Sequence, residues 1–202
     1  WDQDDPYDYD GDHLMLIDGY LSMLEPQSQG LDIRLKKEVV SVQYDDTTQI
    51  QTSDGETITA DAILVTLPLG VLKDDWVKFQ PELPTNKKSA ISRLGFGILN
   101  KIALSFETAF WDQELDWIGT VNTDGNRDMR GHMYLFWNMQ KFAKIPILVA
   151  LVAGDAGDLL EKHDKEAMVN EALATLQRIY KLDQPPTPKT WKVTNWRSEK
   201  YT

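Results

Sequence analysis

Apolar and polar residues alternate along much of the first 66 residues, a pattern that predicts β-strands. Residues 31–36 alternate apolar with charged side chains, and residues 40–44 place three apolar side chains on one face. The Asp54-Gly55 pair lies between two strand-like stretches and is a strong signal for a hairpin turn. Residues 60–66 form a short apolar run, which indicates a strand buried on both faces.

Helix and strand patterns mix in the rest of the chain. A sharp turn is expected at 67–70, and a helix over 85–94 with Thr85 as its N-cap. Apolar residues recur at helical spacing over 165–180, and residues 155–162 are also helical in pattern. Further strands are expected, in chain order, at 98–106, 117–121, 133–137, 147–152 and 190–196. This mixture predicts an α/β fold (α+β mixed) in which sheet dominates the first half.

Composition narrows the class of protein. The 202 residues are 42% apolar and 26% charged, as in a folded domain, and the formal net charge is −11. Such acidity argues against direct nucleic-acid binding, which needs a basic face. The absence of Cys excludes disulfides, thiolate zinc sites and a Cys nucleophile.

The two ends of the chain and its longest apolar run indicate whether the sequence contains a secretory signal or a membrane-spanning segment. The run at 145–153 is far shorter than the roughly 20 residues that span a bilayer, so we expect no membrane segment. The chain opens at Trp1 with neither a Met nor a secretory signal pattern, and it closes without a clear terminating element. We therefore expect it to be part of a longer protein.

The usual catalytic signatures do not occur. The sequence has no G-x-S-x-G, no P-loop and no H-E-x-x-H, and its three His residues are widely spaced. The Gly-x-Gly at 95–97 lacks the third glycine of a dinucleotide fingerprint and follows a predicted helix instead of a strand. No metal site is predicted.

The first 13 residues contain six Asp interleaved with aromatic residues. Mutual repulsion and Pro6 favour a loop or extended chain, and a solvated acidic loop is the simpler interpretation. The alternative is a docking surface that concentrates a cationic ligand near a cleft. Calcium binding is a third interpretation, although the spacing does not match an EF-hand loop.

Lys101 lies inside an apolar strand-like run, where it would share a face with Leu99 and Ala103. The simpler interpretation is a lysine on an exposed face, and the alternative is a buried lysine available for proton transfer or for positioning a water. Trp137 and Trp196 are interpreted first as core aromatics, and alternatively as walls of a cofactor pocket. Periodicity does not choose between these alternatives.

Several motifs together resemble the flavin-dependent amine oxidases, and among these the lysine-specific histone demethylases. The resemblance covers nearly the whole chain. WDQDD followed by DGY at 18–20 favours the demethylase branch over polyamine oxidases. The motifs are WDQDD at 1–5, GDHL at 11–14, GLDIRL at 30–35, VTLPLGVLK at 65–73, RLGFGILNK at 93–101, FW at 110–111, YLFWN at 134–138 and ILVALVAGDA at 147–156.

The resemblance implies part of a two-domain amine oxidase fold. Residues 1–30 would line the substrate entrance, and residues 31–78 would form part of a Rossmann-like FAD-binding domain. Residues 79–195 would form a mixed-sheet substrate domain, and residues 196–202 would begin the return to the FAD domain.

The resemblance also implies residue roles. Lys101 resembles the lysine that holds a water against flavin N5. Asp2, Asp4, Asp5 and His13 resemble an acidic entrance that receives a basic histone tail. The FAD-binding residues implied are Val39 at the adenine end, the turn of Thr66, Leu67 and Pro68 along the cofactor, and the aromatics Trp137 and Trp196 near the flavin and the cavity wall.

Some sequence segments that belong to the family pattern are missing from this chain. No G-x-G-x-x-G segment is present, so the FAD pyrophosphate site would lie outside these residues. By the family pattern, the C-terminal cofactor motif and the last aromatic of the substrate cage would lie beyond Thr202. A helical insertion that binds a corepressor would also lie outside. We therefore expect this chain alone not to be a complete catalyst.

The function implied is FAD-dependent oxidative demethylation of mono- or dimethyl-lysine on histone tails, giving formaldehyde and hydrogen peroxide. The resemblance also implies a nuclear protein. Two alternatives stay open at this point: a polyamine oxidase with the same flavin and lysine, and a non-catalytic acidic module that binds basic tails.

Overall fold

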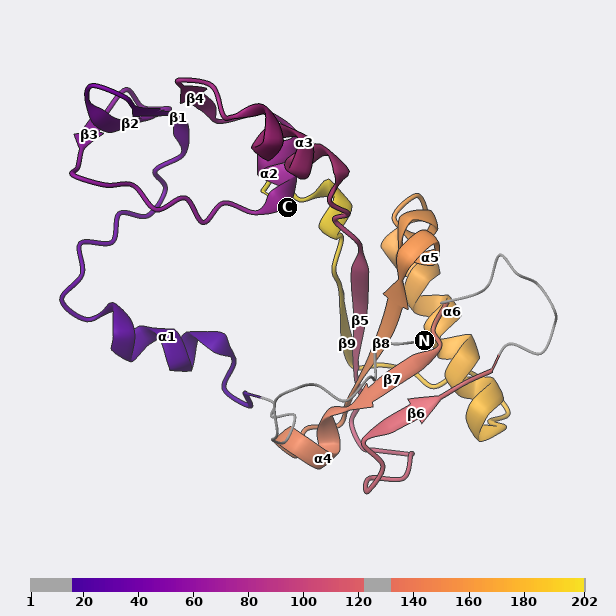
Figure 1. Ribbon diagram of the computed structural model, residues 1–202. Helices are drawn as coiled ribbons and strands as arrows, with labels where there is room; N and C mark the ends of the chain where they lie inside the picture. Colours follow the sequence, from indigo (N-terminus) through magenta and orange to yellow (C-terminus); the bar gives the residue numbers. More distant parts are fainter. Residues whose placement is uncertain (1–15, 122–131, 202) are drawn as a thin grey trace, which may run out of the picture.

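The computed structural model describes residues 16–121 and 132–201, and two sheets organise them into two regions (Figure 1). We call residues 16–97 the first region and residues 98–201 the second region. The first contains a four-stranded sheet of order β3-β2-β1-β4, and the second a five-stranded sheet of order β6-β7-β8-β5-β9. The predicted mixed α/β class is confirmed.

The first sheet is built on the predicted hairpin. Gly55 takes a positive φ of 87° in the turn, which glycine adopts without steric cost, and its N–H donates to the Thr52 carbonyl at 2.9 Å. β4 then pairs with β1 in parallel. The strands are β1 (Val39–Tyr44), β2 (Thr48–Thr52), β3 (Thr57–Thr59) and β4 (Lys78–Gln80). β4 spans the predicted domain boundary at 78–79, and that boundary stays a prediction.

Two strand predictions in the first region are wrong. Residues 31–36 and 60–66 form no strand, and most of their apolar side chains face solvent, with Leu35 80% and Leu64 87% exposed, whereas Ile63 packs against the cluster around Val42. The physical reason is that a strand needs a neighbour along its length for its main-chain groups, and among the described residues neither segment pairs with another strand beyond the Ala60 N–H, which donates to the Thr48 carbonyl at 3.0 Å. The apolar pattern of these segments therefore predicts strands, but the fold places no strand beside them to pair with.

Helix ends also differ from prediction in two places. The expected turn at 67–70 runs into α2 (Leu69–Lys73), because Pro68 has the fixed φ that suits a helix start. Thr85 is the first residue of α3 (Thr85–Arg93) and not its N-cap; that position belongs to Pro84, which has no side-chain cap bond. α1 (Tyr20–Ser28) lies before the first sheet and was not predicted.

The second sheet agrees closely with the predicted strands. The predicted strand at 190–196 is shorter in the structure, because the chain turns after Val193 into a 3₁₀ helix, η3 (Trp196–Ser198). The strands are β5 (Leu99–Ser105), β6 (Trp117–Gly119), β7 (Leu135–Asn138), β8 (Ile147–Ala153) and β9 (Thr190–Val193).

Helices α5 (Gly154–Leu160) and α6 (Lys165–Tyr180) cover one face of this sheet (Figure 1). α6 has the predicted bounds, because Asp164 caps it by accepting the Ala167 N–H at 2.9 Å. The short α4 (Met139–Ala143) follows β7. In the part of the chain that the structure describes, no helix has the length and apolarity to cross a membrane.

The main core lies between α5, α6 and the second sheet. Along β5, Asn100, Ile102 and Leu104 are buried toward the helices, whereas Lys101 and Ala103 lie on the other face and are partly exposed. We call this other face of the second sheet the open face. It is the surface on which the candidate site is built.

Candidate functional site

Strand β5 presents Lys101 on the open face of the second sheet. Its side chain shares that face with Leu99 and Ala103, as strand alternation predicts, and the residue is half-buried. Its cross-strand neighbour on β8 is Leu151, only 5% exposed. Lys101 therefore has an apolar partner beside it, and its side chain lies on the face turned away from helices α5 and α6.

The strand register brings Trp137 to the same face. Ala103 pairs with Val149, and Val149 pairs with Trp137, so all three point to one side of the sheet. Standard strand spacing separates the Cα positions of Lys101 and Trp137 by about 12 Å. Trp137 is thus a wall residue on the lysine-bearing face, outside the main core.

Trp117 is a residue that sequence reasoning missed. It pairs with Trp137 across β6 and β7, and the two rings lie 4.6 Å apart between centroids at an angle of 41°. Trp117 is 41% exposed, so the pair offers an aromatic surface on the open face. Only the register of β6 against β7 reveals this pair, and the single-strand pattern around Trp117 contained no signal for it.

Trp196 reaches the same neighbourhood from the chain end that follows β9. Its backbone N–H donates to Oδ1 of Asn100 at 3.3 Å, next to Lys101 in β5. The residue is 42% exposed at the start of η3. The structure thus brings Lys101, Trp137 and Trp196 to the second sheet.

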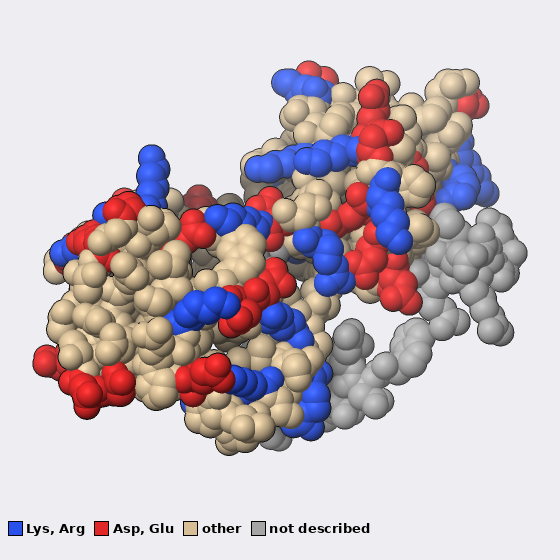
Figure 2. All heavy atoms as spheres, turned by 90° about the horizontal axis from the view of Figure 1, so that it is seen from above, with Lys and Arg blue, Asp and Glu red and all other residues tan. Residues whose placement is uncertain are grey.

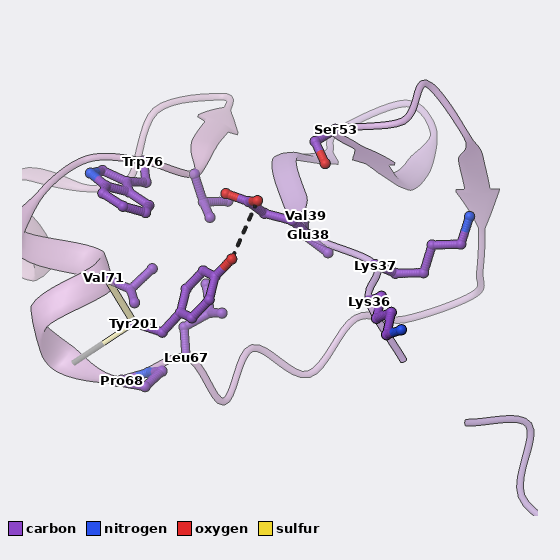
Figure 3. A pocket seen from close by; sticks show the side chains of 11 residues that line it. Lys36, Lys37, Glu38, Val39, Ser53, Leu67, Pro68, Val71, Trp76 and Tyr201 are labelled. Atoms are coloured by element: carbon purple, nitrogen blue, oxygen red, sulfur yellow. Dashed lines mark hydrogen bonds between the residues drawn. The ribbon is translucent and has the colours of Figure 1, made fainter. Parts of the chain in front are cut away.

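A cavity of about 630 Å³ lies against the first sheet and brings together three of the four FAD-binding residues predicted in the first region (Figure 3). Val39 of β1, Leu67 and Pro68 line it together, whereas Thr66 is exposed and does not. The volume is that of a typical small-molecule site. The lining is completed by Lys36, Lys37, Glu38, Ser53, Val71, Trp76, Val77 and Tyr201.

The last described residues close one side of this cavity. Lys200 pairs with Glu38 at 2.9 Å and lies over the rings of Trp76 and Tyr201, at 4.9 and 5.1 Å from their centroids. The Tyr201 hydroxyl donates to Oε2 of Glu38 at 3.4 Å, as Figure 3 shows. A hydrogen bond to Glu38 raises the pKa of Lys200. Tyr201, Trp76 and Glu38 were not predicted, because their meeting joins positions 125 to 163 residues apart.

Charge at the cavity rim is partly neutralised. The Lys37 ammonium lies 2.5 Å from Asp54 Oδ2 and 2.7 Å from Glu56 Oε2. Hydrogen bonds to Asp54 and then Glu56 raise the pKa of Lys37, and the hydrogen bond from Lys37 lowers the pKa of Asp54 to about 2. Lys36 forms no ion pair with any described residue, so it is the rim cation left for an anionic ligand.

Seen from above, the surface has no large area in which all charged side chains have the same sign. Lys and Arg lie interspersed with Asp and Glu over the face in Figure 2. Ion pairs between opposite charges occur among the described residues, such as that of Arg34 with Asp32 at 2.8 Å. The predicted acidic entrance residues Asp2, Asp4, Asp5 and His13 lie outside the described residues. Within residues 16–121 and 132–201, no cluster of His, Asp and Glu could hold a metal ion.

Comparison with solved structures defines the class of fold. Two variants of putrescine oxidase superpose with TM-scores of 0.72 and 0.70 over 90% of this chain and 39% of theirs. Their sequence identities of 18% and 17% make this a likeness of fold. The two-sheet architecture is therefore that of a flavin amine oxidase.

Sequence comparison places the chain within that class. The flavin containing amine oxidoreductase family matches residues 1–202, and the chain belongs to this family. It is 39% identical to lysine-specific histone demethylase 1 homolog 3 of Arabidopsis thaliana and 38% identical to histone demethylase-like protein A of Aspergillus fumigatus, with all of this chain aligned. It covers only 13% and 20% of those two proteins.

FAD is the cofactor that family membership implies, and the cavity suits part of it. Val39, Leu67 and Val71 supply apolar walls for a planar ring, and Lys36 supplies a cation at the rim. No glycine-rich phosphate loop occurs in this sequence. The described residues therefore fit a portion of the nucleotide and leave its pyrophosphate to other residues.

Proposed function

We propose that the complete enzyme oxidatively demethylates mono- and dimethyl-lysine on histone tails. The observation that carries this proposal is the identity of 39% with a lysine-specific histone demethylase homolog along the whole chain, including the strand that bears Lys101. The basic histone tail would be the partner, and the nucleus the compartment. A corepressor would bind through regions outside this chain.

When bound, FAD would accept a hydride from the N-methyl carbon of the substrate and pass the two electrons to oxygen, giving hydrogen peroxide. Val39, Leu67 and Pro68 would hold its nucleotide portion from the cavity. The oxidised substrate is an imine, which adds water and releases formaldehyde and the amine. A trimethylated nitrogen has no lone pair to form the imine, so it would not react.

Lys101 would hold a water at the reacting end of the site. Its ammonium is a hydrogen-bond donor on a half-buried strand position with apolar Leu151 beside it, where few competing water molecules fit. An apolar face also favours the neutral substrate amine, which is the reactive form. Trp117 and Trp137, farther along the same face, would bind other cationic side chains of the basic tail through their ring faces.

The test is anaerobic bleaching of the flavin in the full-length protein loaded with FAD. We expect mono- and dimethyl-lysine histone peptides to remove the oxidised flavin band, and unmethylated and trimethylated peptides to leave it intact. Bleaching by spermine but not by the peptides would establish a polyamine oxidase instead. Full-length protein that retains no flavin, and binds methylated and unmethylated tails equally, would identify an acidic binding module.

A further inference from the structure

Three hydrogen-bonded side chains, the buried Asn100 and the half-buried Glu161 and Thr194, join the end of β9 to strand β5 and helix α5. Asn100 is 2% exposed, and its Nδ2 donates to Oε1 of Glu161 at 2.7 Å. Its Oδ1 accepts from the Thr194 hydroxyl at 3.1 Å and from the Trp196 N–H at 3.3 Å. Asn100 therefore binds three elements at once through one side chain.

Glu161, at the end of α5, gathers the donors of the following turn. Its Oε1 also accepts the Arg197 N–H at 3.0 Å, and its Oε2 accepts from the Ser198 hydroxyl at 3.3 Å. The Arg197 guanidinium donates to both oxygens of Asp158 in α5, at 2.8 and 3.0 Å. The η3 turn that begins with Trp196 is thus attached to α5 by four hydrogen bonds.

Thr194 connects this group to Lys101. The Lys101 N–H donates to the Thr194 hydroxyl oxygen at 2.8 Å, and the Thr194 N–H donates to the Lys101 carbonyl at 3.0 Å. Regular pairing of β9 with β5 ends one residue earlier, at Val193. The hydroxyl therefore satisfies the backbone of Lys101 at the point where the chain leaves the sheet.

Packing alone does not require this arrangement. Asn100 occupies a core-facing position of β5, where its neighbours Ile102 and Leu104 are apolar. A buried amide costs free energy unless it is fully hydrogen-bonded, and when satisfied it fixes one arrangement of its partners. The partners fixed here carry two residues assigned to the site, Lys101 and Trp196.

We propose that Asn100, Glu161 and Thr194 are positioning residues that hold Lys101 and Trp196 in a fixed spatial relation. The proposal rests on the proposed function, in which Lys101 holds the water at the reacting end of the site, and on the resemblance, which implies Trp196 as an aromatic near the flavin and the cavity wall. The three residues touch neither substrate nor cofactor themselves. They act through the backbone of β5 and through η3.

The primary test compares Thr194→Val with Thr194→Ser in the full-length, FAD-loaded protein. Valine keeps the shape and removes the hydroxyl, so we expect anaerobic flavin reduction at saturating dimethyl-lysine peptide to slow by roughly ten-fold or more, with KM little changed. The visible circular dichroism of the bound flavin should change as well. Serine restores the hydroxyl and should return both the rate and the spectrum toward those of the parent protein.

Thr175→Val is the matched control. Thr175 is 2% exposed, more deeply buried than the half-buried Thr194, and its hydroxyl accepts a hydrogen bond from Arg178 within α6. The same substitution there should lower stability while leaving flavin reduction and the flavin spectrum as in the parent. If Thr194→Val fails to fold, Glu161→Gln serves as a second variant, with an expected slowing of roughly three- to five-fold from the weakened hydrogen bonds.

Hydrogen exchange of the Lys101 and Trp196 amides provides a readout independent of activity. Thr194→Val should speed exchange at both amides relative to Thr175→Val. The proposal would be overturned if every Thr194 and Glu161 variant had the flavin-reduction rate, the flavin spectrum and the amide exchange rates of the parent protein. If the parent protein reduces no flavin with any methyl-lysine peptide, the proposed function fails, and the exchange data alone decide whether these residues have a positioning role.

Discussion

The two regions of the molecule bury very different amounts of apolar surface. In the second region, eighteen buried apolar residues form one cluster between the sheet and helices α5 and α6. In the first region only Val42, Val71 and Val77 form such a cluster, and α1 contains no buried residue. Exposed apolar side chains such as Leu35 and Leu64 belong to the first region.

This difference in apolar burial corresponds to different proposed roles for the two regions. The second region has a core large enough to hold Lys101, Trp117 and Trp137 rigidly on its open face. The first region supplies most of the cavity that we propose for the nucleotide, and it exposes apolar side chains such as Leu35 and Leu64. The proposed reacting end and the proposed nucleotide cavity therefore lie mainly in different parts of the chain, with Tyr201 of the second region closing the cavity.

Core substitutions should show the largest contrast between the regions. Leu148→Ala in β8 removes a side chain with 0% exposure and should cost about 2–5 kcal/mol in the free energy of unfolding. Ile50→Ala in β2, which is only partly buried, should cost about 1 kcal/mol or less. Urea denaturation of this chain followed by tryptophan fluorescence measures both. Equal losses would contradict the difference in buried contacts between the two regions.

Lys101→Met should separate chemistry from cofactor binding. We expect flavin reduction by the dimethyl-lysine peptide to slow by about a hundred-fold or more, since the water that Lys101 holds would be lost, while FAD stays bound. Anaerobic stopped-flow absorbance of the full-length protein measures the rate. Lys192→Met is the control, because Lys192 pairs with Ala103 on the same face. Unchanged reduction in the Lys101 variant would remove this residue from the mechanism.

Leu67→Glu should impair FAD binding, in contrast to Lys101→Met, which should impair the chemistry while FAD stays bound. A carboxylate in the apolar wall of the cavity should weaken FAD binding by about ten-fold or more, because a charge there must be desolvated. Equilibrium dialysis of FAD against the full-length protein measures this. Leu115→Glu, at a 46% exposed leucine in the second region, should retain FAD as the parent does. Full FAD retention in the Leu67 variant would place the nucleotide elsewhere.

Trp117→Ala should have a smaller effect on substrate binding. Loss of one ring of the pair removes a cation–π surface, so KM for the dimethyl-lysine peptide should rise by about two- to ten-fold with little change in kcat. Steady-state peroxide production measures both constants. Trp191→Ala is the control, because Trp191 is also 41% exposed but pairs with Leu104 on the opposite face. A similar rise in both variants would contradict a role for the open face.

The smallest expected effect concerns pH and the first region. The pKa of Asp54 is lowered to about 2 by its hydrogen bond from Lys37, so the folded state favours the ionised carboxylate. The stabilisation is fully present above the ordinary pKa of 3.8 and is lost as the pH falls through about 2. NMR titration of the Asp54 carboxyl carbon should give a midpoint near pH 2. A midpoint near the ordinary value would show that the ion pair is absent in solution.

Local sequence determined much of the second region. The apolar spacing over 165–180 and the Asp164 cap together specify α6, and the Asp54-Gly55 pair specifies the hairpin of the first sheet. The family was also readable from sequence, because its motifs are short runs such as RLGFGILNK at 93–101. These features depend on residues close together in the chain, where helix spacing, capping and turn preferences act directly.

Only the tertiary structure determined which residues distant in the sequence come into contact. The same apolar patterning formed β8 and left 60–66 without a strand, because only β8 has neighbours to pair with. The Trp117–Trp137 pair, the approach of Tyr201 to Glu38 and the hydrogen bonds between Asn100 and Thr194 each join distant positions. Such contacts depend on strand register and on how elements pack, and the periodicity of a single segment contains neither.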